Sequence, residues 1–392
     1  MKICLVHNAY GKLSGEEVAV EGLRESLMNH GHTVIPFFRS SAELDGRQLG
    51  RIGAFFTGIY NVATRREFAR LLDAARPDVV HINNLFPLIS PSILDETKRR
   101  GIPTVMTVHN YRLFCPTGLL FSHGEVCHRC ADAGECWCAI RNCAGEWPKS
   151  AGYAMRSWAA RLRRSFADGI DRFVAPTEFV KSMMIRYGYS AERVDVVRYI
   201  VSLERIHSNL TDFGYVGYVG RISPEKGVDT IVEASRQCPE ISFRLAGHYL
   251  RMPDLPEQAP ANCKFIGEIP AGQVADFVSA ARFIVFSSRW YETTGLSLVE
   301  AMACGKTVLC SRIGCLPEFV EDGSTGLLFE PGDSRDLAEK IRYLWERPEL
   351  CRKMGAAARK KILAMFSPEV NYKRLLDTYY AASNGMSAVN RA

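Results

Sequence analysis

The chain has 392 residues, of which 47% are hydrophobic and 23% charged, and its formal net charge is +6. This length suits two domains of ordinary size, and the composition excludes a largely disordered chain and a collagen-like repeat. No stretch of about 18 apolar residues occurs, and the apolar start at Ile3–Val6 is too short for a signal peptide. We therefore expect a cytoplasmic protein with no transmembrane helix.

The first half alternates short β-branched apolar segments with longer amphipathic ones. The predicted strands are Ile3–Val6, Thr33–Phe38, Val79–Ile82, Thr104–Val108 and Arg172–Ala175. Helical patterns at Glu16–His30 and Ser90–Arg100 are each followed by a glycine, which suits a helix C-terminus. This alternation predicts a parallel sheet covered by helices.

The same alternation restarts after residue 210. The predicted elements are strands 215–219, 242–246, 283–287 and 307–311 and helices 228–238, 272–281 and 297–304. A linker is expected near 199–211, and after Ser334 the pattern is helical to about Ala382, with a frayed tail.

The predicted fold class is α/β, with two Rossmann-like doubly wound domains facing a cleft. We assign residues 1–200 to the first domain, with a cysteine-rich insertion at 115–143, and residues 201–367 to the second. Residues 368–392 are expected to form a helix that crosses back to the first domain. In such sheets ligands bind beyond the carboxyl ends of the strands.

The loop after the predicted strand 215–219 carries two cations, Arg221 and Lys226. An arginine fork and a lysine point charge at this end of a strand can bind a diphosphate. Surface cations at a helix start explain the same residues equally well. This loop alone therefore leaves both interpretations open.

A second segment, residues 287–305, leads from a strand through a loop into a helix. Glu292 lies in the loop, and Glu300 lies on the helix among apolar residues, an unusual place for a solvated charge. Gly295 and Leu296 open the helix, so their free backbone N–H groups favour a phosphate. A carboxylate one turn further can accept the hydroxyls of a ribose, and one in the loop can contact a sugar.

At these residues the sequence resembles the large group 1, or family four, of retaining glycosyltransferases with the GT-B architecture. The matching segments are Gly-Arg-(four residues)-Lys-Gly at 220–227, Glu-(seven residues)-Glu at 292–300, Ala-Met-Ala-Cys-Gly at 301–305, Pro-Glu at 317–318 and the glycine-rich 323–333. The resemblance implies that Arg221 and Lys226 bind the donor phosphates, together with the backbone N–H groups of Gly295 and Leu296. It also implies that Glu300 holds the ribose and that Glu292 contacts the transferred sugar.

Two positions depart from the family pattern. Thr293 and Thr294 stand where the family usually has Gly-Phe, which bears on the contacts to the donor sugar, so Thr294 joins the donor-binding candidates. Thr307 stands where the family usually has proline, and this change concerns packing.

Two segments of the first half also resemble the family. In the first loop, Gly15 is implied to lie near the donor diphosphate and the acceptor, although a turn with Ser14 as helix N-cap explains the same residues. His109 follows a strand and is similar to the family's His-Asp, with Asn110 in place of the aspartate. We expect His109 in the active site, where a neutral imidazole can contact the donor sugar or orient the acceptor hydroxyl.

Six of the 13 cysteines lie between residues 115 and 143. One C-x2-C pair with irregular partners is a weaker zinc pattern than two matched pairs. A structural zinc and reduced thiols are the two alternatives, and no cofactor is expected for catalysis. The zinc candidates are Cys127, Cys130, Cys136, Cys138 and Cys143.

Residues 150–167 combine arginines with apolar residues at helical spacing. This segment lies in the half that carries the excess positive charge, with 26 Lys and Arg against 20 Asp and Glu in residues 1–198. The helix can lie on an anionic membrane surface, or it can pack with a solvated arginine face. The arginines are Arg156, Arg161, Arg163 and Arg164.

The predicted function is transfer of a hexose-type sugar from a nucleotide-sugar to an acceptor hydroxyl, with retention implied by the resemblance. The expected setting is bacterial exopolysaccharide, lipopolysaccharide or lipid-linked glycan synthesis, at the inner face of the cell membrane if the helix at 150–167 binds lipid. Alternatives are a nucleotide-sugar epimerase of the same fold and a non-catalytic sugar-binding or nucleic-acid-binding protein. The near-balanced charge weighs against a nucleic-acid partner.

Overall fold

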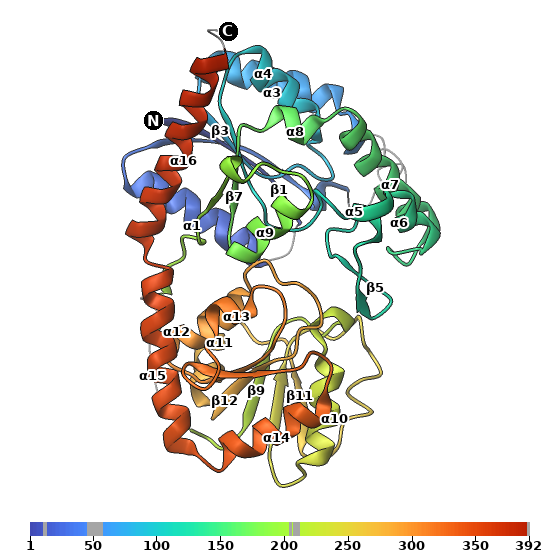
Figure 1. Ribbon diagram of the computed structural model, residues 1–392, viewed down its shortest axis with the longest axis vertical. Coiled ribbons are helices and arrows are strands. Elements are labelled where there is room, and N and C mark those ends of the chain that lie inside the picture. Colours follow the sequence, from blue (N-terminus) through green and yellow to red (C-terminus); the bar gives the residue numbers. More distant parts are fainter. Residues whose placement is uncertain (11–13, 45–57, 204–205, 207–211, 390–392) are drawn as a thin grey trace. The chain divides into compact units, whose positions relative to one another are not determined.

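The computed structural model describes residues 1–10, 14–44, 58–203, 206 and 212–389. The chain divides into two compact units (Figure 1). The first unit comprises Met1–Ser122, Cys127–Val201 and Pro368–Ala392, and the second comprises His123–Val126 and Ser202–Ser367. Each unit is built on a six-stranded parallel sheet, which confirms the predicted class of two Rossmann-like doubly wound domains.

In the first unit the strand order is β2-β1-β3-β4-β7-β8, and every pair is parallel. The central strand β3 is buried along its whole length because helices cover both faces of the sheet. The bounds are β1 (Lys2–Ala9), β2 (Thr33–Ser40), β3 (Val79–Asn84), β4 (Thr104–Thr107), β7 (Arg172–Ala175) and β8 (Val194–Val196).

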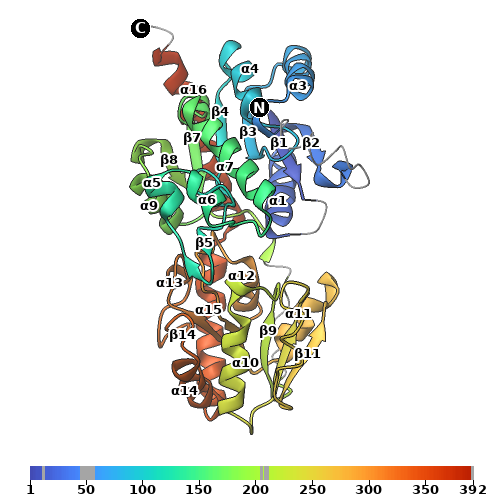
Figure 2. The ribbon, with the colours of Figure 1, turned by 90° about the vertical axis from the view of Figure 1, so that its right-hand side faces the viewer.

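One face of this sheet is covered by α1 (Gly15–Asn29) and α16 (Pro368–Val389), which lie side by side in both ribbon views (Figures 1 and 2). Leu23 of α1 and Tyr379 of α16 are buried in one core with Val105 of the sheet. The other helices of this unit are α3 (Val62–Ala75), α4 (Leu94–Arg99), α7 (Trp147–Leu162), α8 (Ser165–Gly169) and α9 (Glu178–Arg186).

The second unit has the strand order β11-β10-β9-β12-β13-β14. Its bounds are β9 (Val216–Val219), β10 (Phe243–Ala246), β11 (Cys263–Gly267), β12 (Phe283–Phe286), β13 (Val308–Ser311) and β14 (Gly326–Phe329). Helices α10 and α14 pack beside each other over its main core, and α12 packs against α15. The helices are α10 (Val228–Gln237), α11 (Ala271–Ala280), α12 (Leu296–Ala303), α13 (Leu316–Phe319), α14 (Ser334–Trp345) and α15 (Pro348–Met365).

The cysteine-rich insertion forms small elements of its own. A two-stranded sheet joins Phe121–Ser122 (β5) to Glu125–Val126 (β6), and two short helices follow, α5 (Arg129–Ala133) and α6 (Cys136–Ile140). Helix α6 packs against α7.

Two further expectations concern the C-terminal tail and the linker. The helical pattern was expected to end near Ala382, and α16 continues to Val389. Most of the expected linker, together with residues 11–13 of the first loop, lies outside the described residues. Among the helices that are described, none combines the length and apolar character needed to cross a bilayer.

Candidate functional site

The predicted donor-binding residues follow β9 and β12, two strands that are neighbours in the second sheet. The strand order reverses between β9 and β12. From β9 the chain continues to β10 on one side of it, and it later returns to form β12 on the other side. In doubly wound sheets the loops after two such strands diverge and leave room for a ligand. The sequence motifs therefore lie at the topological switch point of the second unit.

Hydrogen bonds to backbone carbonyl oxygens join these two loops. The Ser287 hydroxyl donates to the Lys226 carbonyl oxygen at 2.9 Å, and the Arg289 N–H donates to the Glu225 carbonyl oxygen at 2.9 Å. Gly227 lies so close to Ser287 that an added Cβ would be 2.2 Å from its carbonyl oxygen, and its φ is +62°. Only glycine fits here without displacing the loop that carries Lys226.

Lys226 and Glu292 form a direct ion pair, with 2.6 Å between Nζ and Oε1. The same carboxylate oxygen accepts hydrogen bonds from Ser288 at 2.7 Å and from the indole N–H of Trp290 at 3.0 Å. Glu292 is buried, and burial raises its pKa, but the Lys226 ammonium and the donated hydrogen bonds outweigh this effect. The net pKa of Glu292 is below its ordinary value, so the carboxylate is ionised at neutral pH.

Helix α12 begins beside this pair. Gly295, in the left-handed region at φ +73°, is its N-cap, and Leu296 is its first residue. Gly295 has no side chain that could cap the helix, so the N–H groups at its very start, before those of Leu298 and Val299 that donate to the Gly295 carbonyl oxygen, can bind an anion. The hydroxyl of Thr294 is buried and has no hydrogen-bond partner within the described residues, and a bound polar ligand could supply one.

The other two predicted donor-binding residues have different surroundings. Arg221 is half-exposed and pairs with Glu225 at 3.1 Å, so its fork is already engaged on one side. Glu300 lies on α12 one turn beyond its start and is partly buried. Burial raises the pKa of Glu300.

In the first unit, His109 lies just beyond β4, as predicted, but protein groups occupy both ring nitrogens. Nδ1 lies 2.9 Å from the Tyr199 hydroxyl, and Nε2 lies 2.8 Å from the amide oxygen of Asn83. Burial lowers the pKa of His109 well below its ordinary value, so the ring is neutral. A cavity of about 20 Å³, lined in part by His109, Asn110 and Arg112, lies at this end of the sheet.

The first loop supports both interpretations of its residues. Ser14 caps α1 by accepting a hydrogen bond from the Glu16 N–H at 3.3 Å, which confirms the N-cap expectation. Gly15 is the first residue of that helix. The predicted place of Gly15 near the donor diphosphate and the acceptor stays a prediction.

Sequence reasoning missed a buried polar cluster at the end of β1. His7 is 3% exposed, and neither of its ring nitrogens has a hydrogen-bond partner among the described residues. The nearest carboxylates of that part of the chain are Glu16 at 3.9 Å and Glu17 at 4.0 Å. Burial raises the pKa of Glu16 to about 7, although Arg112 opposes the shift. The available signal was the pair of glutamates directly after Gly15 in a strand-to-helix loop, but their burial is a tertiary effect.

The cysteine-rich insertion brings some thiols together without forming a metal site. Cys130 and Cys138 are buried in a small core with Ala154, and Cys143 packs against it, whereas Cys136 is exposed. Burial raises the pKa of Cys130 to about 12, so the thiol stays protonated. Within the part of the chain that the structure describes, no three His, Cys, Asp or Glu side chains are placed to hold a metal ion. The structural zinc therefore stays a prediction.

Comparisons with known proteins agree with the motifs. The family model for glycosyl transferases group 1 matches residues 203–361, and the model for Glycosyltransferase Family 4 matches residues 13–205. A relative from Klebsiella pneumoniae, an uncharacterised 42.6 kDa protein of the cps region, is 25% identical over 350 residues, 81% of this chain and 87% of that protein.

Solved structures show the same fold across nearly the whole chain. Sucrose-phosphate synthase from Thermosynechococcus elongatus has a TM-score of 0.73 at 20% identity, covering 97% of this chain and 99% of that one. HepE from Anabaena, solved with UDP and glucose, has a TM-score of 0.67 at 18% identity, covering 97% of this chain and 100% of that one. The two family models match consecutive stretches that together span most of the chain, and the protein belongs to the group 1 glycosyltransferases, with the GT-B fold.

Proposed function

We propose that this glycosyltransferase moves a hexose-type sugar from a nucleotide-sugar to an acceptor hydroxyl, with retention. The observation that carries the proposal is the Lys226–Glu292 ion pair at the switch point of the second unit, beside the start of α12. A cation, a buried ionised carboxylate and free helix N–H groups together match a diphosphate linked to a sugar. The complex of HepE with UDP and glucose supports a uridine nucleotide as the first donor to test.

The residues of the second unit supply the electrostatics of the reaction. Breaking the anomeric bond leaves negative charge on the diphosphate, and the Lys226 ammonium, Arg221 and the first N–H groups of α12 oppose that charge. Because these groups are held before the substrate arrives, they need little reorganisation during the reaction.

The carboxylates bind the two sugars of the donor. Glu292 is an acceptor held in place by Ser288 and Trp290, so it can take a hydroxyl of the transferred sugar. Glu300 lies one turn into α12, where it can accept from the ribose hydroxyls. Retention rests on the family resemblance, and none of these roles needs a metal ion.

The first unit is proposed to bind the acceptor, a glycan or a lipid-linked glycan of cell-envelope polysaccharide synthesis. The origin of the Klebsiella relative in a cps region favours this setting. His109 is proposed to act through its position at the end of β4, as a neutral ring fixed by Tyr199 and Asn83.

We also propose that α7 contacts an anionic membrane surface. Four large apolar side chains of this helix are exposed, and at this spacing they share one side of it. One predicted contributor to its basic face is wrong: Arg156 is buried, donates to the Pro116 carbonyl oxygen at 3.1 Å and stacks on Phe86. The exposed residues and their exposed fractions are Trp147 (62%), Met155 (38%), Trp158 (50%) and Leu162 (67%).

A donor screen tests the catalytic proposal. Purified protein is incubated with a panel of nucleotide-sugars, and release of the nucleoside diphosphate is measured, with and without membrane lipids as acceptor. One donor should be turned over, and Lys226→Ala and Glu292→Gln should each abolish turnover, whereas Lys353→Ala, an exposed lysine of α15, should not. If neither Lys226→Ala nor Glu292→Gln changed the turnover rate, the assignment of these residues to the donor site would be refuted.

Vesicle binding tests the membrane proposal separately. Wild-type protein should bind phosphatidylglycerol vesicles, and Trp158→Ser should weaken binding about tenfold, since it removes a large exposed apolar side chain. Tyr343→Ser in α14, also an exposed aromatic, is the matched control. If Trp158→Ser and Tyr343→Ser weakened vesicle binding equally, the result would contradict a membrane contact through α7.

A further inference from the structure

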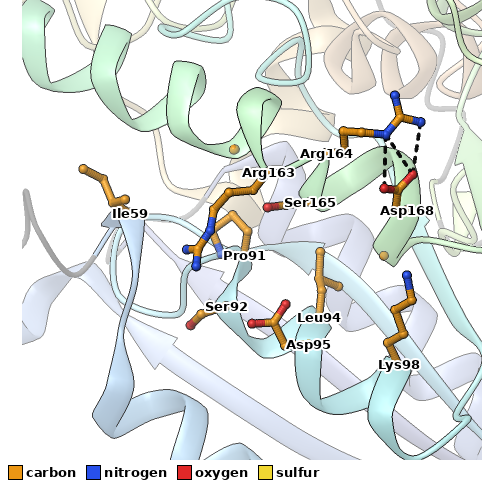
Figure 3. A pocket seen from close by; sticks show the side chains of 12 residues that line it. Ile59, Pro91, Ser92, Leu94, Asp95, Lys98, Arg163, Arg164, Ser165 and Asp168 are labelled. Carbon is orange, nitrogen blue, oxygen red and sulfur yellow. Dashed lines mark hydrogen bonds and ion pairs between the residues drawn. The ribbon is translucent and has the colours of Figure 1, made fainter.

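A pocket of about 300 Å³ opens at the C-terminal end of α7 (Figure 3). It lies within the first unit, and α4, α7 and α8 supply most of its lining. Arg163 and Ser165 reach into this space from the α7–α8 side, and Lys98 reaches into it from α4. The pocket is separate from the groups assigned above to the donor.

Each of the two acidic residues of the lining lies within 4 Å of an arginine. Asp168 forms an ion pair with Arg164 at 3.1 Å, and Asp95 lies 3.8 Å from the guanidinium of Arg65. The lining carries three cations, Lys98, Arg163 and Arg164, against the two carboxylates, so its formal charge is positive.

Three other polar side chains of the lining can donate hydrogen bonds to a ligand. Neither Lys98 nor Arg163 forms an ion pair within 4 Å in the described part of the chain, although the charge of Lys98 helps to lower the pKa of Asp168. The Arg163 guanidinium rests on the Tyr60 ring at 4.8 Å. The Ser165 hydroxyl has no hydrogen-bond partner among the same residues. Two unpaired cations and one hydroxyl donor facing one space match the oxygens of a phosphate.

The surroundings of the pocket indicate where such a phosphate comes from. Leu162, 67% exposed, directly precedes Arg163, and Trp158 lies one turn earlier on the same side of α7. We propose that the pocket binds the phosphate of an anionic lipid headgroup while the apolar side of α7 lies among the acyl chains. This inference rests on the membrane contact proposed above and adds a specific headgroup site to it.

Binding to vesicles of phosphatidylglycerol and of phosphatidylcholine tests the site. Lys98→Gln and Arg163→Gln are compared with Lys149→Gln, which removes an exposed cation from the first turn of the same helix. Loss of a surface cation from general attraction alone weakens binding about fivefold. The pocket variants should weaken phosphatidylglycerol binding more than twentyfold, and Ser165→Ala several-fold, with unchanged melting temperatures.

Two outcomes would overturn the proposal. Equal losses for Lys98→Gln and Lys149→Gln would show general charge attraction without a headgroup site. Tight binding of inorganic phosphate that depends on Lys98, with vesicle binding unaffected by the pocket variants, would show a site for soluble phosphates. Nucleoside diphosphate release in solution is measured in parallel, because failure of that assay counts against the proposed transferase reaction and leaves the vesicle result interpretable.

Discussion

The ammonium group of Lys226 donates to Oε1 of Glu292 across 2.6 Å and so joins the loop after β9 to the loop after β12. Each side chain offsets the desolvation cost of the other, because an unpaired buried charge would strongly destabilise the fold. The pair links donor binding to the stability of the second unit, and double substitution separates the two effects.

Lys226→Ala should lower the free energy of unfolding by about 3 kcal/mol at neutral pH, since it leaves the Glu292 carboxylate buried and unpaired. The folded pKa of Glu292 is lowered, so its stabilising contribution is present above its unfolded pKa and is lost as pH falls through the folded value. In the Lys226→Ala variant this acid-dependent loss should disappear in urea titrations at pH 3–7. Adding Glu292→Gln should restore stability without restoring turnover; failure to restore stability would contradict the pairing argument.

Thr294→Val should leave the melting temperature unchanged or higher, because the buried hydroxyl it removes has no partner. The same change should weaken nucleotide-sugar binding about three- to tenfold, since a neutral hydrogen bond is worth about 0.5–1.5 kcal/mol. Calorimetry on the two proteins measures both quantities. A marked drop in stability with unchanged affinity would show that the hydroxyl serves the fold.

Gly227→Ala should destabilise the protein and abolish turnover, because the new Cβ would strike the Ser287 carbonyl oxygen and displace Lys226. Gly214→Ala is the matched control: its φ is +69°, close to the +62° of Gly227, but nothing lies within 4 Å of the added Cβ. The control should show only the conformational cost of about 1 kcal/mol. Equal effects of the two changes on turnover would argue against the close approach.

Glu16→Gln should change how stability depends on pH. Burial raises the folded pKa of Glu16 to about 7, so the wild type loses stability as pH rises from the ordinary glutamate value through 7. The variant cannot lose stability in this way. Between pH 4 and pH 8 its free energy of unfolding should therefore rise by on the order of 3 kcal/mol relative to that of the wild type. Glu25→Gln, an exposed glutamate of the same helix, should follow the wild-type curve.

Metal analysis of the purified protein decides between the two alternatives for the cysteine-rich insertion. A structural zinc would appear as about one equivalent per chain, and removing it with a chelator would lower the melting temperature. Reduced thiols would give no metal and full reaction of the exposed Cys136 with a thiol reagent. The thiols as placed here favour the second result.

The local part of the fold was predictable from the sequence. The apolar positions of Val228–Gln237 repeat at helical spacing, and Arg172–Ala175 is a compact apolar stretch, so their types and bounds follow from periodicity. Strands Val194–Val196 and Gly326–Phe329 were not predicted, because an aspartate interrupts the first and the second lies within a glycine-rich segment typical of a loop. Their place comes from pairing with β7 and β13.

The candidate site was predictable only where its residues form a recurrent spacing. Lys226 and Glu292 belong to such motifs, and the structure brings them into contact. Among the described residues the buried ring of His7 has no hydrogen-bond partner. Its burial comes from the packing of several elements, which the spacing of residues along the sequence does not predict. The pocket likewise joins Lys98 to Arg163 across a long stretch of sequence.

Isothermal titration of UDP into the wild type, Lys226→Ala and Lys353→Ala tests the central claim, that the switch point of the second unit holds the donor diphosphate. The wild type should show one UDP site, Lys226→Ala should bind UDP at least tenfold more weakly, and Lys353→Ala should keep the wild-type affinity. Equal UDP affinity in all three proteins would contradict it.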